Sequence, residues 1–208
     1  MASVDTSLRP FEPGSTGWSA SDLDDPEIER LWSDGRYEII DGVLADLGPA
    51  YFTSGVAVAE LLFACHRHIK SQRGISSFAP AVDIIIDQWR VVRADAVMMM
   101  PSDLQRHNRA VRNSGRDPKR TRILVPPTLV IESVCPGHEL HDTRTKLRWY
   151  AKFGVPNYWI LDAFEETLVC WMMRDGAYHR DVDGAGANII RPKLFPGLDL
   201  SLSEFWYE

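Results

Sequence analysis

The sequence predicts one domain of the α/β or α+β class, built on a single mixed β-sheet. Its 208 residues, of which 45% are hydrophobic, suffice for one sizeable core and are too few for two independent domains. Helical patterns are interspersed with short apolar runs of strand length. Over residues 126–162 a strand, a helix and a second strand follow in turn, an order that suits a crossover between parallel strands.

The first half of the chain opens with a short helix in residues 21–35. Asp41-Gly42, which stands between two apolar runs, is a strong signal for a hairpin. A longer helix over residues 56–74 is expected next, with Thr53 or Ser54 as its N-cap. Three strands are expected after it, at residues 75–79, 81–86 and 94–100.

In the second half, Ser102 and Gln105 match a capping box at the start of a helix that carries three arginines. The composition of residues 126–134 indicates a buried strand, and Asp175-Gly176 indicates a second hairpin. The other expected elements are a helix over 138–154, a strand over 156–162 and a last half-turn or helix over 202–206.

The charge balance argues against broad nucleic-acid binding, because the chain carries a net charge of -6. Leu104–Arg122 is an exception, with seven cations against one acid, or +6, which leaves -12 for the remainder. This segment is either a solvated face or an element that contacts nucleic-acid phosphates. In the second case the contacts would come from Arg106, Arg109, Arg112, Lys119 and Arg120.

Residues 1–20 have neither the basic region nor the apolar region of a signal peptide, and we expect them to form a flexible tail before a single domain at 21–208. No apolar run approaches 18 residues, so no membrane span is expected. Three cysteines at unrelated spacings do not suggest a disulfide framework. These features favour a cytoplasmic protein.

Lys146 occupies an unusual place in the helix at 138–154. On a helical wheel it falls in the middle of an apolar stripe, with Glu139 and Asp142 on the same side. The stripe consists of Trp149, Tyr150 and Phe153, and the far side carries Arg144, Arg148 and Lys152. An unpaired buried ammonium is costly, so this lysine must either extend past the aromatic side chains to water or meet buried negative charge. A simple helix pair between Asp142 and Lys146 is the alternative interpretation.

Two acids in apolar strands are candidates to meet Lys146. Glu132 lies in "LVIESV" and Asp95 in "ADAVMM", where an ionisable side chain needs a partner or a metal. Two carboxylates on neighbouring strands can share one hard divalent ion, and Mg²⁺ prefers such ligands together with phosphate oxygens. A lysine beside that ion could orient the attacking water or stabilise charge on a phosphoryl group.

Five segments in order resemble the Uma-two family of restriction-endonuclease-like proteins, within the PD-(D/E)XK nuclease superfamily. They are "YEIIDGVL", "ADAVMM", "LVIESVCP", "HDTRTKLRWYAKFGVPNYWILD" and "LFPGLDLSLSEFW", and the likeness covers roughly 36–206. The resemblance implies a restriction-endonuclease-like mixed sheet flanked by helices, with an N-terminal hairpin. It further implies a Mg²⁺-dependent phosphodiesterase site, with Mn²⁺ as an alternative ion, DNA as partner and a homodimer.

By the same resemblance Asp95 and Glu132 stand for the two metal-binding acids. The superfamily's usual lysine would fall two residues after Glu132, where this chain has Val134. In the Uma-two family the following helix typically supplies the lysine, and Lys146 is at the matching place. Glu38 matches a further acid that is either an accessory ligand or a structural group.

The leading hypothesis is therefore a metal-dependent DNA endonuclease in which Asp95, Glu132 and Lys146 are catalytic. The alternative is a weak or inactive nuclease-like scaffold that binds DNA or a protein. A third hypothesis, a zinc site, rests on the spacing of Cys135, His138 and His141. It departs from the HExxH pattern, whose histidines lie four residues apart.

Overall fold

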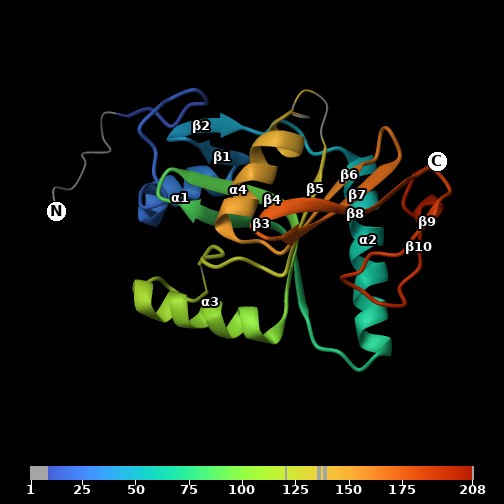
Figure 1. Cartoon of the computed structure of the whole chain (residues 1–208). Helices are drawn as coiled ribbons and strands as arrows, with labels where there is room; N and C mark the ends of the chain where they lie inside the picture. Colours follow the sequence, from blue (N-terminus) through green and yellow to red (C-terminus); the bar gives the residue numbers. More distant parts are fainter. Residues whose placement is uncertain (1–8, 120, 135–136, 138–139, 208) are drawn as a thin grey trace. The chain divides into compact units, whose positions relative to one another are not determined.

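The computed structural model describes residues 9–119, 121–134, 137 and 140–207 (Figure 1). The chain separates into two compact units. The smaller comprises Met1–Pro49 and Asp83–Arg93, and the larger comprises Ala50–Val82 and Ala94–Glu208. Two strands, β3 (Ser77–Asp87) and β4 (Arg90–Met99), pass from one unit into the other. A single domain over 21–208 accordingly stays a prediction.

The smaller unit is built around the hairpin of β1 (Tyr37–Ile40) and β2 (Val43–Asp46). Asp41 and Gly42 both have positive φ, at 51° and 81°, as the predicted tight turn requires. β1 also pairs with the first part of β4 through Ile39 and Val91. The described residues of this unit also form η2 (Asp22–Asp24) and α1 (Pro26–Ser33).

The prediction of a flexible tail over residues 1–20 is wrong for its described part. Trp18 is fully buried in the core of the smaller unit and packs edge-on against Phe11. The Trp18 amide also donates to the Gly42 carbonyl at 2.9 Å, so the segment is held by the hairpin turn. The polar, glycine-rich composition of this stretch concealed the burial of Trp18.

The larger unit contains a sheet with the strand order β4-β5-β6-β7-β8. β5 (Leu129–Ser133) is antiparallel to β4 and parallel to β6 (Asn157–Asp162), which confirms the predicted crossover. β7 (Thr167–Arg174) and β8 (Ala177–Ala185) complete the sheet as a hairpin turned at Asp175-Gly176. The sheet is therefore mixed, as the sequence predicts.

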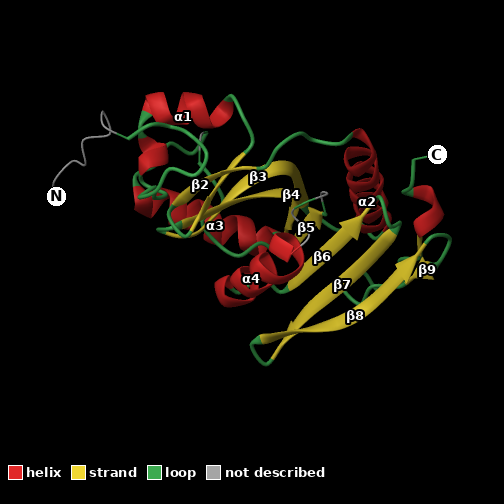
Figure 2. Cartoon of the chain, turned by 90° about the horizontal axis from the view of Figure 1, so that it is seen from above, coloured by secondary structure: helices red, strands yellow, loops and turns green. Residues whose placement is uncertain are grey.

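The two faces of this sheet carry different helices (Figure 2). Leu129, Ile131 and Trp159 share one core with α2 (Phe52–Ser71). Because side chains alternate along a strand, the residues between them face the other side. There Tyr158 contacts Tyr150 of α4 (Leu147–Phe153), with ring centroids 5.0 Å apart. The face under α4 is the one that holds the candidate site.

Several element boundaries differ from the prediction. The strands expected at 75–79 and 81–86 form the one strand β3, and α2 begins after Tyr51 without a side-chain cap from Thr53 or Ser54. α3 (Pro101–Ser114) is capped by Asp103, whose carboxylate accepts from the Met100 amide at 3.1 Å. The remaining elements are η3 (His141–Lys146), β9 (Ile189–Ile190), β10 (Leu200–Ser201) and η4 (Leu202–Glu204). None of the helices in the described ranges is long and apolar enough to cross a membrane.

Candidate active site

The Lys146 side chain points to the inner side of its helix and lies between two carboxylates. Its Nζ is 3.2 Å from Glu132 Oε2 and 3.1 Å from Asp142 Oδ1. The exposed fractions of the three side chains are 3%, 2% and 8%. A lysine buried to this extent requires such partners, because an isolated charge in the interior is strongly unfavourable. Lys146 thus meets both the strand acid and the helix acid.

Two tyrosine hydroxyls donate hydrogen bonds to the residues of this cluster. The Tyr150 hydroxyl donates to Glu132 Oε1 at 2.6 Å, so each oxygen of that carboxylate has a partner. The Tyr158 hydroxyl donates to the backbone carbonyl of Asp142 at 2.9 Å. Burial, with the nearby charge of Glu132 as a second cause, raises the pKa of Tyr158 well above its usual value. The Tyr158 hydroxyl therefore stays a protonated donor at neutral pH.

Asp95 shares the sheet face of Glu132. Ala96 is opposite Ile131 in the antiparallel register of β4 and β5, and one further step along that register sets Asp95 opposite Glu132. Opposite residues in such a pair have Cβ atoms roughly 5 Å apart. Asp95 Oδ2 also accepts from the Ser133 amide at 2.7 Å. Asp95 is only partly buried, which makes it the acid of this group that solvent reaches most readily.

The segment that supplies Lys146 and Asp142 is a π-helix. η3 covers six residues with this wider turn and passes directly into the α-helical α4. Such turns are rare and often occur at functional sites. The predicted inner and outer faces are nevertheless confirmed by burial. Lys146, Trp149 and Tyr150 are buried and Phe153 is half-buried, whereas Arg144, Arg148 and Lys152 are exposed.

The charges of the cluster suit a divalent cation. Asp95, Glu132 and Asp142 supply three negative charges against one positive charge from Lys146, a balance of -2. Two strand carboxylates on one face are the oxygen donors that Mg²⁺ prefers, with water and phosphate oxygens completing its shell. Within the described residues no three His, Cys, Asp or Glu side chains form a metal-holding group. Asp95 and Glu132 as ligands of a divalent ion therefore stay a prediction.

The accessory acid and one basic residue have structural partners. Glu38 is fully buried in β1 and accepts from the Arg93 amide at 3.0 Å within the smaller unit. Arg106 pairs with Asp103 at 2.7 Å, so its charge is balanced on α3 itself. Arg109, Arg112 and Lys119 are exposed. Whether any of them contacts nucleic acid stays a prediction.

The zinc hypothesis cannot be traced through its ligands, because Cys135 and His138 lie outside the described residues, as does Arg120 of the basic segment. His141 is described, and its ring lies edge-on to Trp149 with centroids 5.5 Å apart.

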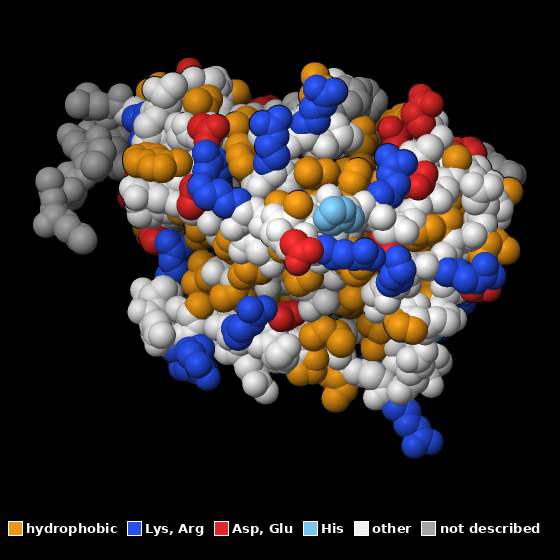
Figure 3. All heavy atoms as spheres, in the orientation of Figure 1, with side chains coloured by type: hydrophobic (Ala, Val, Ile, Leu, Met, Phe, Trp, Pro, Cys, Tyr) orange, Lys and Arg blue, Asp and Glu red, His pale blue; other side chains and the backbone are white. Residues whose placement is uncertain are grey.

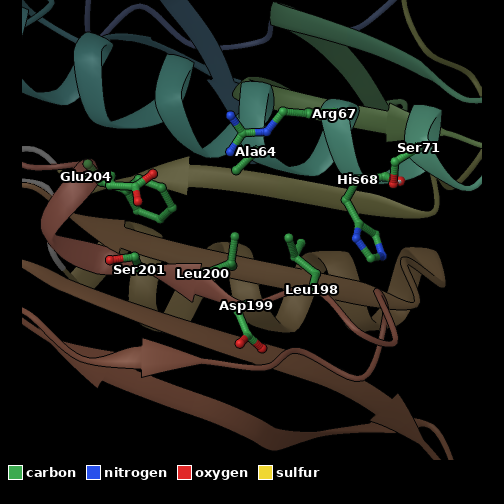
Figure 4. A pocket seen from close by; sticks show the side chains of 10 residues that line it. Ala64, Arg67, His68, Ser71, Leu198, Asp199, Leu200, Ser201 and Glu204 are labelled. Carbon is green, nitrogen blue, oxygen red and sulfur yellow. Dashed lines mark hydrogen bonds between the residues drawn. The ribbon is translucent and has the colours of Figure 1, made fainter.

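Two hollows of the larger unit lie apart from the acid cluster in their lining residues. One, of about 310 Å³, lies between α2 and the C-terminal segment. Figure 4 shows His68 extending from the helix toward the C-terminal segment, whose lining residues include Leu198 and Asp199. The other, of about 320 Å³, is lined by residues of α3 and the loop after it, among them His107 and Arg112.

Sequence reasoning missed the residues that hold the acids in place. Tyr150 was interpreted only as part of an apolar stripe, and the Ser133 amide carries no side-chain signal at all. A hydroxyl in an otherwise apolar stripe was the available clue, because a buried tyrosine usually finds a hydrogen-bond partner.

Comparison with known proteins identifies the family of the chain. The family model described as Uma2, "Putative restriction endonuclease", matches residues 25–203. The chain belongs to the Uma2 family. A solved structure titled as a "putative nuclease belonging to DUF820", from Anabaena variabilis, is similar to this Uma2 chain with a TM-score of 0.62. The two are 15% identical, over 83% of this chain and 90% of the other, so the likeness concerns the fold. No curated protein matches the chain.

Proposed function

We propose that this Uma2 chain is a metal-dependent endonuclease that hydrolyses phosphodiester bonds in DNA. The observation that carries the proposal is the buried contact of Lys146 with Glu132, on the sheet face that Asp95 shares. Buried charge of this kind is seldom retained without a specific role, although a structural ion pair is also known to persist.

In this proposal Asp95 and Glu132 hold Mg²⁺ or Mn²⁺. When bound, the ion supplies an activated water and polarises a phosphoryl oxygen. Lys146 lies between two carboxylates and contributes positive charge near the phosphate. Asp142 keeps the ammonium in place, and Tyr150 fixes the orientation of Glu132.

The decisive experiment is cleavage of supercoiled plasmid DNA with Mg²⁺ or Mn²⁺. The wild-type protein should nick or linearise the plasmid, and a chelator should abolish this activity. Asp95→Asn and Lys146→Gln, purified in the same way, should each lose about 100-fold or more, the order expected when a preorganised charged group is removed. Equal activity in all three proteins would show that a contaminant cuts the DNA.

Basic residues outside the cluster add an accessory part to the proposal. Arg109, Arg112 and Lys119 have no acidic partner among the described residues. We include them as contacts to substrate phosphates, and Arg109→Gln/Arg112→Gln should then weaken DNA binding in a salt-dependent manner. Arg106→Gln is the matched control, because Arg106 is already paired with Asp103.

The second candidate function is a nuclease-like scaffold that binds without cutting. The near-complete burial of Glu132, Lys146 and Asp142 favours it, since a self-balanced ion cluster can serve the fold alone. DNA binding without cleavage under any divalent ion would support this alternative. A homodimer and a cytoplasmic location complete the proposal, and the mass of the protein in solution tests the first of these.

A further inference from the structure

The outer face of the helix that carries Lys146 is uniformly basic. Arg144, Arg148 and Lys152 follow one another at intervals of four residues, and all three are exposed. We refer to these three side chains as the basic ridge. Residues four apart lie on one side of a helix, so the ridge is continuous over η3 and α4. Figure 3 shows Lys and Arg side chains gathered over α4 on this face.

The ridge is not balanced by acids of its own segment. Residues 143–154 contain four cations and no acid, and only Lys146 among them points inward to carboxylates. Within the described residues, no ion pair engages Arg144, Arg148 or Lys152. The contrast with the rest of the chain is marked, because the whole protein carries a net charge of -6. Three outward cations in an acidic protein form a local surface for a polyanion.

The position of the ridge connects it to the candidate site. Lys146 lies on the inner side of the same helix turns, and a helix with its side chains is roughly 10–12 Å across. The ridge and the acid cluster are thus separated by the width of this helix, and the outer face is the one open to a polyanion.

We propose that the basic ridge, Arg144, Arg148 and Lys152, binds the phosphate backbone of duplex DNA on the outer face of the helix that carries the acid cluster on its inner face. The proposal rests on the proposed DNA substrate but does not depend on cleavage. Arginine and lysine contacts to phosphates position the duplex and carry no sequence information, so binding through the ridge is independent of base sequence. Each contact releases counterions, which makes the binding strongly dependent on salt.

The test measures binding of a labelled 20-base-pair duplex by fluorescence anisotropy in chelator, between 50 and 200 mM salt. Arg148→Gln/Lys152→Gln removes two charges of the ridge. Arg67→Gln/Lys70→Gln is the matched control, because it removes the same two residue types from exposed positions on α2. The ridge variant should bind about tenfold or more weakly, with a salt slope smaller by about 2, whereas the control should bind like wild type.

Equal losses in the ridge variant and the α2 control would overturn the proposal, as would unchanged binding of the ridge variant. Tighter wild-type binding of an RNA duplex in the same assay would assign the ridge to RNA and also overturn it. Circular dichroism shows that the exposed substitutions leave the fold intact. The binding assay contains no metal, so its result does not depend on cleavage. If the ridge binds DNA but the protein does not cut DNA, only the endonuclease proposal is contradicted.

Discussion

At the scale of single residues, Lys146 shows that a buried charge requires a partner of opposite charge. Lys146→Met removes the cation and leaves Glu132 and Asp142 buried beside each other. We expect unfolding to become easier by about 3–5 kcal/mol, the cost of breaking a buried ion pair from one side. Urea denaturation measures it, and Lys152→Met, an exposed lysine of the same helix, should change stability by less than about 0.5 kcal/mol.

Removal of Asp142 provides the complementary test. If the two charges compensate each other, Lys146→Met/Asp142→Leu should be more stable than Lys146→Met alone. Additive losses would contradict the interpretation that these two residues form one coupled pair.

Tyr150 donates its hydrogen bond to Glu132, and this contact can be tested by a substitution that removes only the hydroxyl oxygen. Tyr150→Phe removes the hydrogen bond to Glu132 Oε1 and should cost about 1.5–3 kcal/mol, because the acceptor is charged and buried. Tyr178→Phe is the control, since its hydroxyl donates to the Val155 carbonyl at 2.8 Å instead. A positioning role predicts in addition that Tyr150→Phe needs more Mg²⁺ for half-maximal cleavage, which Tyr178→Phe should not. An equal shift in both variants would leave Tyr150 with a packing role only.

At the scale of elements, α3 depends on Asp103. Its carboxylate accepts from the Met100 amide, from Arg106 and from the Thr128 hydroxyl, and Thr128 directly precedes β5. Asp103→Ala should destabilise the protein by about 1–2 kcal/mol and speed amide exchange in the first turn of α3. Asp117→Ala changes an exposed acid after the helix and should do neither. Unaltered exchange in Asp103→Ala would show that the helix start is held by other contacts.

The two hairpin turns and the cap of α3 show where rules based on neighbouring residues succeed and where they fail. Both hairpins were predictable, because Asp41-Gly42 and Asp175-Gly176 tolerate the positive φ that their turns need. The cap of α3 was assigned to Ser102 and Gln105, although Asp103 performs it. Adjacent polar residues compete for one cap, and a partner on another segment, here Thr128, helps to decide between them.

At the scale of the whole molecule, buried tyrosines predict sensitivity to alkali. Burial raises the pKa of both Tyr158 and Tyr178, while in the unfolded chain each ionises near its ordinary value of about 10. The unfolded state therefore binds fewer protons than the folded state above that pH, and stability falls as pH rises. The loss should approach ~1.4 kcal/mol per pH unit for each tyrosine.

Denaturation between pH 9 and 11.5 measures this slope. Tyr158→Phe should flatten it, apart from a constant offset for the lost bond to the Asp142 carbonyl. Tyr207→Phe alters an exposed ring and should leave the slope unchanged. The buried thiols of Cys65 and Cys170, whose pKa values burial also raises, contribute a loss of the same sign in every variant. A slope identical in all three proteins would contradict the assignment to Tyr158.

The amino-acid pattern alone was sufficient for the class of fold, the two tight turns, the crossover and the inward position of Lys146. Each of these follows from local periodicity or local turn chemistry, which neighbouring residues determine. Other features depend on residues far apart in the chain. Packing of distant segments produces the burial of Trp18 and the π-helical turn of η3. It also produces the hydrogen bonds from Tyr150 to Glu132 and from the Ser133 amide to Asp95. Local patterns therefore placed the charged groups on their strands and helix, and the tertiary structure decided which of them meet.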